Sequence, residues 1–332
     1  MSNVGSMLRT RLTELLQVDH PVMLAGMGGV SYHEVVAAVS EAGGFGCLGA
    51  SAMGRTTMNA EIAATRALTA KPFGVDLLTA APGDLVSQVE DLIRGGASVF
   101  VAGLGVPRDV IELCHEHNVL VTSMCGKVRH AVAAVEAGCD IVVAQGTEAG
   151  GHTGTIATMP LVPQIVDAVK GRVPVVAAGG IFDGRGLAAA LALGAEGIWV
   201  GTRFIATPEA MSVLGYKDAL LAAGEDGTVV TRAYTGKTCR VVANDYTRDW
   251  ERRADELQPF PMQFVRSVED GANHMGGTPE TPGVDPTKEF YAAGQGVGAI
   301  HEIVPAGELV HRFVADAQEV LDRLSAVWET AS

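Results

Sequence analysis

The chain has 332 residues, of which 48% are hydrophobic and 41 are glycine, and its formal net charge is −14. This acidic balance argues against a nucleic-acid partner, which requires a basic surface, and no apolar run approaches the ~20 residues of a membrane span. Residues 1–16 lack the apolar core of a secretory signal, so we expect a cytoplasmic protein without a membrane segment.

Eight short apolar runs recur between residues 21 and 202, and most are followed by a glycine-bearing turn and a helical stretch. Nearly continuous apolar runs of this kind are typical of parallel strands that are buried on both faces. We predict strands over residues 21–26, 45–50, 73–78, 98–103, 119–124, 140–146, 173–180 and 197–202.

Eight strands that alternate with alanine-rich helices predict an α/β fold of the (β/α)8 TIM-barrel type. The alternative is an open, doubly wound sheet, which the same alternation of elements also produces. The rhythm ends after residue 205, where polar and proline-bearing stretches begin. We therefore expect a barrel made of residues 1–205 and 296–332, closed by a helix over 305–328. Residues 206–295 would form a smaller inserted cap or substrate domain, helical near 247–257 and 261–270.

Three features suggest cofactor sites and are rejected on spacing. Cys114, His115 and His117 lie at a predicted helix end without an acidic residue or second cysteine to complete a metal site, so we expect no metal. The G-x-G-x-x-G pattern at 44–49 follows a helix and enters a strand, the reverse of a dinucleotide loop. The sequence TGKT at 235–238 has Thr231 where a phosphate loop requires its first glycine.

The active site of a barrel lies where the strands end and the βα-loops begin. The loops after the seventh and eighth strands carry Gly179, Gly180, Gly201 and Thr202. Backbone N–H groups in these two loops commonly bind phosphate, and glycine permits its close approach. These residues therefore predict a phosphate site. The other candidates at strand ends are Ala25, Gly26, Met27, Asp76, Gln145, Glu148 and His152.

His152 stands in the glycine-rich stretch EAGGHTG after the sixth predicted strand. An imidazole with a pKa near ~6.5 is largely neutral at pH 7, so it can accept a proton from an acidic carbon or hydrogen-bond a nitro oxygen. We predict that His152 is the catalytic residue.

The segments HPVMLAGMGGVS, EAGGHTG, VPVVAAGGIFDGRGLAAALALGAEGIWVGTRF and AAGQGVGAI resemble the nitronate monooxygenase (2-nitropropane dioxygenase) family and its relatives, the FMN-dependent enoyl-thioester reductases. The resemblance covers nearly the whole chain. It implies a barrel with a smaller inserted domain, non-covalently bound FMN and no metal.

The resemblance also implies roles for individual residues. The backbone of Ala25, Gly26 and Met27 would lie beside the flavin ring, and His152 occupies the family's catalytic position. The other residues implied to contact the flavin are Gln145 and Gly151 at the ribityl chain and ring edge, Gly179, Gly180, Gly201 and Thr202 at the phosphate, and Gln295 and Gly296 in the return loop. The chain departs from the family at Asp76, where Asn is frequent, and near Met124, where many members carry Lys.

We therefore expect an FMN-dependent oxidoreductase that oxidises nitronates or nitroalkanes with O2 to a carbonyl compound and nitrite. The alternative is an NAD(P)H-dependent reductase of enoyl or related CoA or carrier-protein thioesters, or of quinones. A non-catalytic flavin-binding protein is a third class, but it would have no need of His152. A homodimer is usual for barrels of this size and is expected here.

Overall fold

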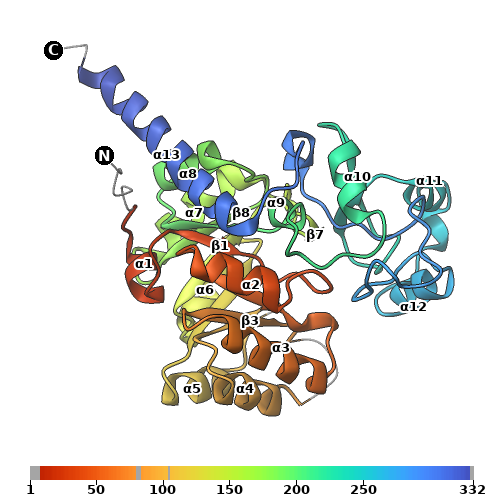
Figure 1. The fold of residues 1–332 in the computed structure, drawn as a ribbon, viewed down its shortest axis with the longest axis horizontal. Coiled ribbons are helices and arrows are strands. Elements are labelled where there is room, and N and C mark those ends of the chain that lie inside the picture. Colours follow the sequence, from red (N-terminus) through yellow and green to blue (C-terminus); the bar gives the residue numbers. More distant parts are fainter. Residues whose placement is uncertain (1–7, 80–83, 104, 330–332) are drawn as a thin grey trace.

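The computed structural model describes residues 8–79, 84–103 and 105–329 and shows a barrel beside a smaller segment that carries α10, α11 and α12 (Figure 1). The start of the N-terminal stretch, from which we inferred the absence of a secretory signal, lies outside the described residues. In the described chain, every predicted strand is present, and each of its ends lies within two residues of the expected position. The barrel strands are β1 (Val22–Leu24), β2 (Gly46–Gly49), β3 (Phe73–Leu77), β4 (Val99–Ala102), β5 (Leu120–Cys125), β6 (Ile141–Gln145), β8 (Val175–Ala178) and β9 (Gly197–Val200).

These strands form one parallel sheet in the order β1-β9-β8-β6-β5-β4-β3-β2. A parallel bridge between Met23 and Phe45 joins the two edges, so the sheet closes. The prediction of a TIM barrel is confirmed, and the open doubly wound sheet is wrong because β1 has partners on both sides.

Helices surround the barrel, as the alternating pattern predicts. The long C-terminal helix packs along α8 and α2, and its last turns extend beyond the barrel (Figure 1). The helices of this layer are α1 (Arg11–Leu16), α2 (His33–Glu41), α3 (Arg55–Leu68), α4 (Leu85–Arg94), α5 (Arg108–Glu116), α6 (Val128–Ala137), α7 (Thr158–Val169), α8 (Gly184–Ala192), α9 (Thr202–Ile205) and α13 (Ala306–Glu329), with short 3-10 turns at Ala50–Ala52 and Gln295–Ala299.

Two apolar layers hold the barrel together. Side chains of alternate strand positions, including Phe45, Val101 and Trp199, fill its interior, and Leu12 and Leu16 of α1 pack in the same cluster. The larger layer lies between the strands and the surrounding helices. Because both faces of every strand are covered, the strands are apolar along nearly their whole length.

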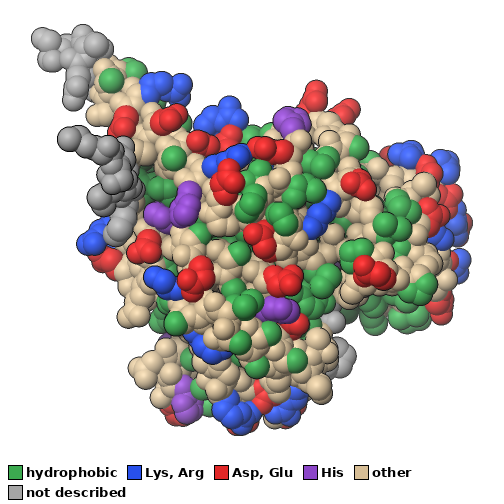
Figure 2. All heavy atoms as spheres, in the orientation of Figure 1, with side chains coloured by type: hydrophobic (Ala, Val, Ile, Leu, Met, Phe, Trp, Pro, Cys, Tyr) green, Lys and Arg blue, Asp and Glu red, His purple; other side chains and the backbone are tan. Residues whose placement is uncertain are grey.

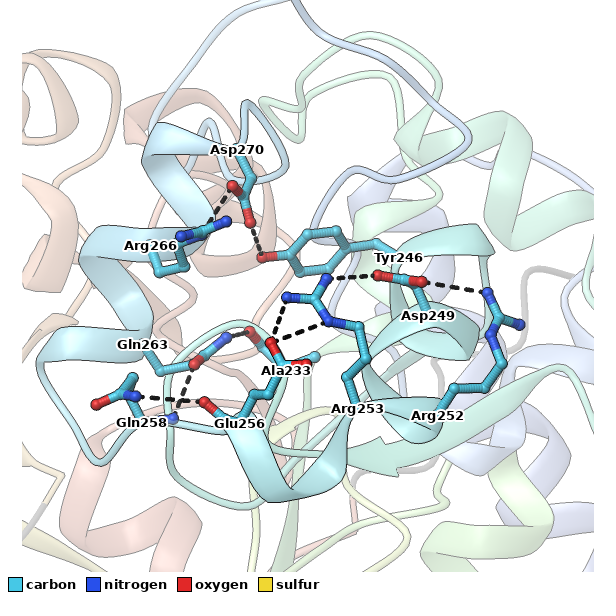
Figure 3. A network of polar contacts seen from close by, with 10 residues as sticks. All are labelled: Ala233, Tyr246, Asp249, Arg252, Arg253, Glu256, Gln258, Gln263, Arg266 and Asp270. Atoms are coloured by element: carbon cyan, nitrogen blue, oxygen red, sulfur yellow. Dashed lines mark hydrogen bonds and ion pairs between the residues drawn. The ribbon is translucent and has the colours of Figure 1, made fainter.

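The segment between α9 and the return to the barrel has a small core of its own, which includes Tyr234, Cys239 and Trp250. Figure 3 shows the polar network on its surface, where Arg253 lies between Asp249 and Glu256. Its elements are α10 (Tyr216–Ala222), β10 (Thr228–Thr231), β11 (Cys239–Val242), α11 (Asp245–Arg252), a 3-10 turn (Ala254–Glu256) and α12 (Met262–Glu269). The two helical regions expected here are present, whereas the β10–β11 hairpin was not predicted.

Acidic and basic side chains are interspersed over the face shown in Figure 2. No helix among residues 8–79, 84–103 and 105–329 is long and apolar enough to span a membrane.

Candidate active site

The carboxyl ends of the barrel strands open into a cavity of about 830 Å3, which the inserted segment also lines. Gln295 instead lines an adjoining cavity of about 320 Å3, and its role remains a prediction. The other predicted site residues all line the main cavity: Ala25, Gly26, Met27, Asp76, Gln145, Gly151, His152, Gly179, Gly180, Gly201, Thr202 and Gly296.

The backbone after β1 lies directly against Asp76 of β3. A Cβ atom on Gly26 would lie 2.3 Å from the Cβ of Asp76, so only glycine fits at this position. Ser31 fixes the loop, because its hydroxyl donates to the Ala25 carbonyl (2.8 Å) and accepts from the Met27 N–H (3.2 Å). The Gly26 N–H donates to no other described residue and is therefore available to a ligand.

Asp76 carries a carboxyl group without a hydrogen-bonding partner among the described residues. Asp76 is half-buried in the cavity wall, and desolvation by the surrounding protein raises its pKa well above the ordinary value. Its ionisable neighbour Cys47 is itself fully buried. These surroundings favour the neutral acid, the state in which the departure from Asn to Asp adds no negative charge to the cavity.

Gly179 and Gly180 form a glycine cradle at the end of β8. Their φ angles are +107° and +74°, values that L-residues rarely adopt. A Cβ on Gly179 would lie 2.8 Å from the Thr158 hydroxyl and 3.1 Å from the Ala149 nitrogen. Neither N–H group of the cradle donates to another described residue. Together with the N-terminal end of α9 at Thr202, the cradle presents hydrogen-bond donors to an anion.

The glycine-rich stretch after β6 serves two purposes. Glu148 does not line the main cavity, because its carboxylate accepts the Thr158 N–H at the start of α7 (2.8 Å). Gly150 packs against the return segment, where a Cβ would lie 2.7 Å from the Ala293 carbonyl carbon. Gly151 has a φ of +73° and borders the cavity. Close packing against the return segment therefore accounts for Gly150 without a ligand.

His152 is held from three sides. Its backbone forms the short strand β7 (Gly151–His152), which pairs antiparallel with β11, so that His152 is opposite Cys239. Gln145 donates its side-chain amide to the His152 carbonyl at 2.9 Å. The imidazole Nε2 lies 3.0 Å from the Thr235 hydroxyl, whereas Nδ1 contacts no other described polar atom. Burial lowers the pKa of His152, and the positive charge of Lys237 lowers it further.

The structure adds cavity residues that the sequence did not indicate. Lys127, Arg232 and Lys237 bring positive charge to the cavity, and no ion pair joins any of them to a described carboxylate. The positive charge missing near Met124 is therefore supplied by other residues. His274 also lines the cavity, with Nδ1 2.6 Å from the buried carboxylate of Glu289. Their signals in the sequence are weak, since most of these residues lie in the inserted segment, far along the chain from the barrel motifs.

Among the described residues, no group of three or more His, Cys, Asp or Glu side chains is arranged to hold a metal ion. Cys114 is buried in α5, where burial raises the pKa of its thiol to about 12. His115 instead contacts Asp140, with Nε2 2.9 Å from the carboxylate.

Comparison with known proteins identifies the chain's relatives. The family model described as nitronate monooxygenase matches residues 9–85 and 79–316. A protein of Mycobacterium tuberculosis named (3aS,4S,5R,7aS)-5-hydroxy-7a-methyl-1-oxo-octahydro-1H-indene-4-carboxyl-CoA dehydrogenase is 36% identical over 97% of this chain and 99% of its own length. A Staphylococcus saprophyticus protein named "Probable nitronate monooxygenase" is 35% identical over 77% of this chain and 84% of its own.

Among solved structures, FabK from Thermotoga maritima superimposes with a TM-score of 0.85 at 34% sequence identity. The match covers 96% of this chain and 99% of FabK. The inserted segment is therefore part of the shared architecture, as well as the barrel.

Proposed function

Because the chain belongs to the nitronate monooxygenase family and is a flavin-dependent oxidoreductase, we propose that its main cavity binds FMN and oxidises nitronates or nitroalkanes with O2. The products would be a carbonyl compound and nitrite. The observation that carries this proposal is that His152 and the Gly179–Gly180 cradle line one cavity.

The residues present fit FMN. The volume of about 830 Å3 lies within the ~300–1,000 Å3 of small-molecule and cofactor sites. The unpaired N–H groups of Gly179 and Gly180 would bind its single phosphate, and the backbone at Gly26 would border the ring. The cradle has no side chain that would occupy the place of a phosphate. Contacts from Gln145, Gly151, Gly201, Thr202, Gln295 and Gly296 are part of the same proposal.

Bound FMN would accept the electron pair of the substrate and pass it to O2. The chain itself supplies the proton chemistry and the charge. His152 has a lowered pKa and is neutral at pH 7, so it can accept the proton that a neutral nitroalkane releases from carbon. Lys127 and Lys237 offset the negative charge of a nitronate in the same cavity.

A second candidate is NAD(P)H-dependent reduction of an acyl thioester by the same site. Two observations favour it: the size of the cavity, and the 36% identity to a relative whose name specifies a CoA thioester. In that reaction His152 would donate a proton to the substrate carbon instead of accepting one.

The test begins with the purified protein. Heat denaturation should release FMN, identified by chromatography and mass, and light scattering should give the mass of a homodimer. With propyl nitronate, the protein should consume O2 and form nitrite. Release of FAD would refute the FMN assignment. Turnover of a crotonyl thioester with NADPH, without any nitrite from the nitronate, would favour the second candidate.

A further inference from the structure

The turn between β10 and β11 contains the TGKT sequence that the phosphate-loop pattern failed to explain. It contributes to the site in another way, because it meets the loop of His152 across the cavity wall. Thr235 is 3% exposed, and its hydroxyl oxygen lies 3.0 Å from His152 Nε2. These two residues are 83 positions apart in the chain.

The other contacts of the Thr235 hydroxyl restrict the direction of this hydrogen bond. The hydroxyl donates to the Lys237 carbonyl at 3.2 Å and accepts from the Lys237 N–H at 3.2 Å. A hydroxyl group has one hydrogen to donate. When that hydrogen is directed to Lys237, the oxygen can only accept from the imidazole, so Nε2 must carry the ring hydrogen.

The position of Thr235 is itself fixed by α12. Gln263 donates to the Ala233 carbonyl at 2.6 Å, and Ser267 donates to the Tyr234 carbonyl at 2.9 Å, immediately before Thr235 (Figure 3 shows the Gln263 contact). On the other side, the Thr153 N–H donates to the Thr238 carbonyl at 3.2 Å. The backbone and the ring of His152 are thus both held by one hairpin of the inserted segment.

We propose that Thr235 is a positioning residue that holds His152 as the Nε2–H tautomer and so presents Nδ1 to the substrate. Nδ1 has no other described partner, and His152 lines the cavity, so its lone pair is free to accept a proton. The expected effect on turnover rests on the proposed function of His152 as a base. The assignment of the tautomer does not depend on that function.

The variant that tests this proposal is Thr235→Val, which keeps the shape of the side chain and removes the hydroxyl. Turnover of neutral nitroethane should fall by about 10- to 100-fold, the loss typical of metal-bound imidazoles whose orienting partner is removed. The KM and the flavin content should change little, and Thr235→Ser should restore the rate. Thr65→Val is the matched control, because Thr65 is also buried but bonds only to the Glu61 carbonyl of its own helix.

A second readout is independent of activity. In 15N-histidine-labelled protein, NMR should show His152 with its hydrogen on Nε2, assigned by comparison with His152→Ala. The Nε2 hydrogen should exchange slowly in the wild type and rapidly in Thr235→Val. Two other groups face this contact, Lys237 and the buried Cys239. Burial raises the pKa of Cys239 to about 12, so its thiol is neutral at the pH of the NMR measurement.

The outcomes separate this proposal from the proposed function. An Nδ1–H tautomer in the wild type, or full activity in Thr235→Val while His152→Ala is inactive, would overturn the role of Thr235. Absence of turnover of both nitronate and neutral nitroalkane in the wild type would instead refute the proposed function, and the NMR result would still decide the tautomer.

Discussion

Replacing Asp76 by Asn should stabilise the protein at neutral pH and have no such effect in acid. The half-buried Asp76 carboxyl packs against Gly26 in the cavity wall without a hydrogen-bonding partner among the described residues, and desolvation by the surrounding protein raises its pKa well above the ordinary value. Asn has nearly the same shape and no charge to bury.

The sign and size of the effect follow from proton linkage. The unfolded chain releases the proton at a pH near ~3.9, whereas the native state keeps it until the raised pKa is reached. Between these two pH values, stability falls by about 1.4 kcal/mol per pH unit, and it is constant below and above them. The advantage of Asp76→Asn should therefore be near zero at pH 4 and should grow above it, by about 1.4 kcal/mol for each pH unit up to the raised native pKa.

Urea denaturation of the flavin-free protein at the two pH values measures this difference directly. Asp167→Asn, an exposed position on α7, is the control and should have little effect at either pH. If Asp76→Asn is equally stable or less stable than the wild type at pH 7, the carboxyl is ionised and paired in the native protein, and the argument from its burial is wrong.

Three further predictions concern the cavity. Gly179→Ala should lower FMN retention and cost about 1–3 kcal/mol of stability, because a Cβ there would require a disfavoured φ and would approach Thr158 and Ala149 too closely. The control is Gly171→Ala, which also has a positive φ but does not line the cavity, and this variant should keep its flavin. His152→Ala should slow turnover of neutral nitroethane by about 10²–10⁴-fold and mainly weaken binding of preformed nitronate, measured as kcat and KM for each. The rate with neutral nitroethane should decline only below a pH of about 6.5, where His152 becomes protonated. Lys237→Met should move that decline to higher pH, because the Lys237 charge lowers the pKa of His152. An unchanged pH profile would show that the Lys237 charge does not act on His152.

The barrel strands can be predicted from the sequence because a strand that is covered on both faces is apolar along nearly its whole length. Such a run is visible in a few adjacent residues, without knowledge of the rest of the fold. VFVA in β4 and VVAA in β8 illustrate it. The ends of the strands differ by a few residues because glycine turns extend the apolar runs. The β10–β11 hairpin escaped prediction because its strands, Thr228–Thr231 and Cys239–Val242, are only four residues each, and because β11 pairs on its other side with a two-residue strand far away in the chain.

The residues of the candidate site also differ in how well the sequence indicates them. Residues at strand ends, such as Gly179 and His152, are indicated by their position after a recognisable strand. Thr235 and Lys237 reach the cavity only through the fold of the inserted segment, and no local pattern specifies such a contact. The raised pKa of Asp76 depends on desolvation by residues that the fold packs around it, such as Gly26, and the residue type alone does not reveal it.

The proposed function requires that FMN bound in this cavity accepts electrons from a nitronate. Anaerobic stopped-flow mixing of the FMN-loaded protein with propyl nitronate, in parallel with NADH and NADPH, tests it most directly. We predict rapid loss of the flavin absorbance with the nitronate, and its return with nitrite formation when O2 is admitted. Rapid bleaching by NADH or NADPH, with no response to the nitronate, would contradict the claim.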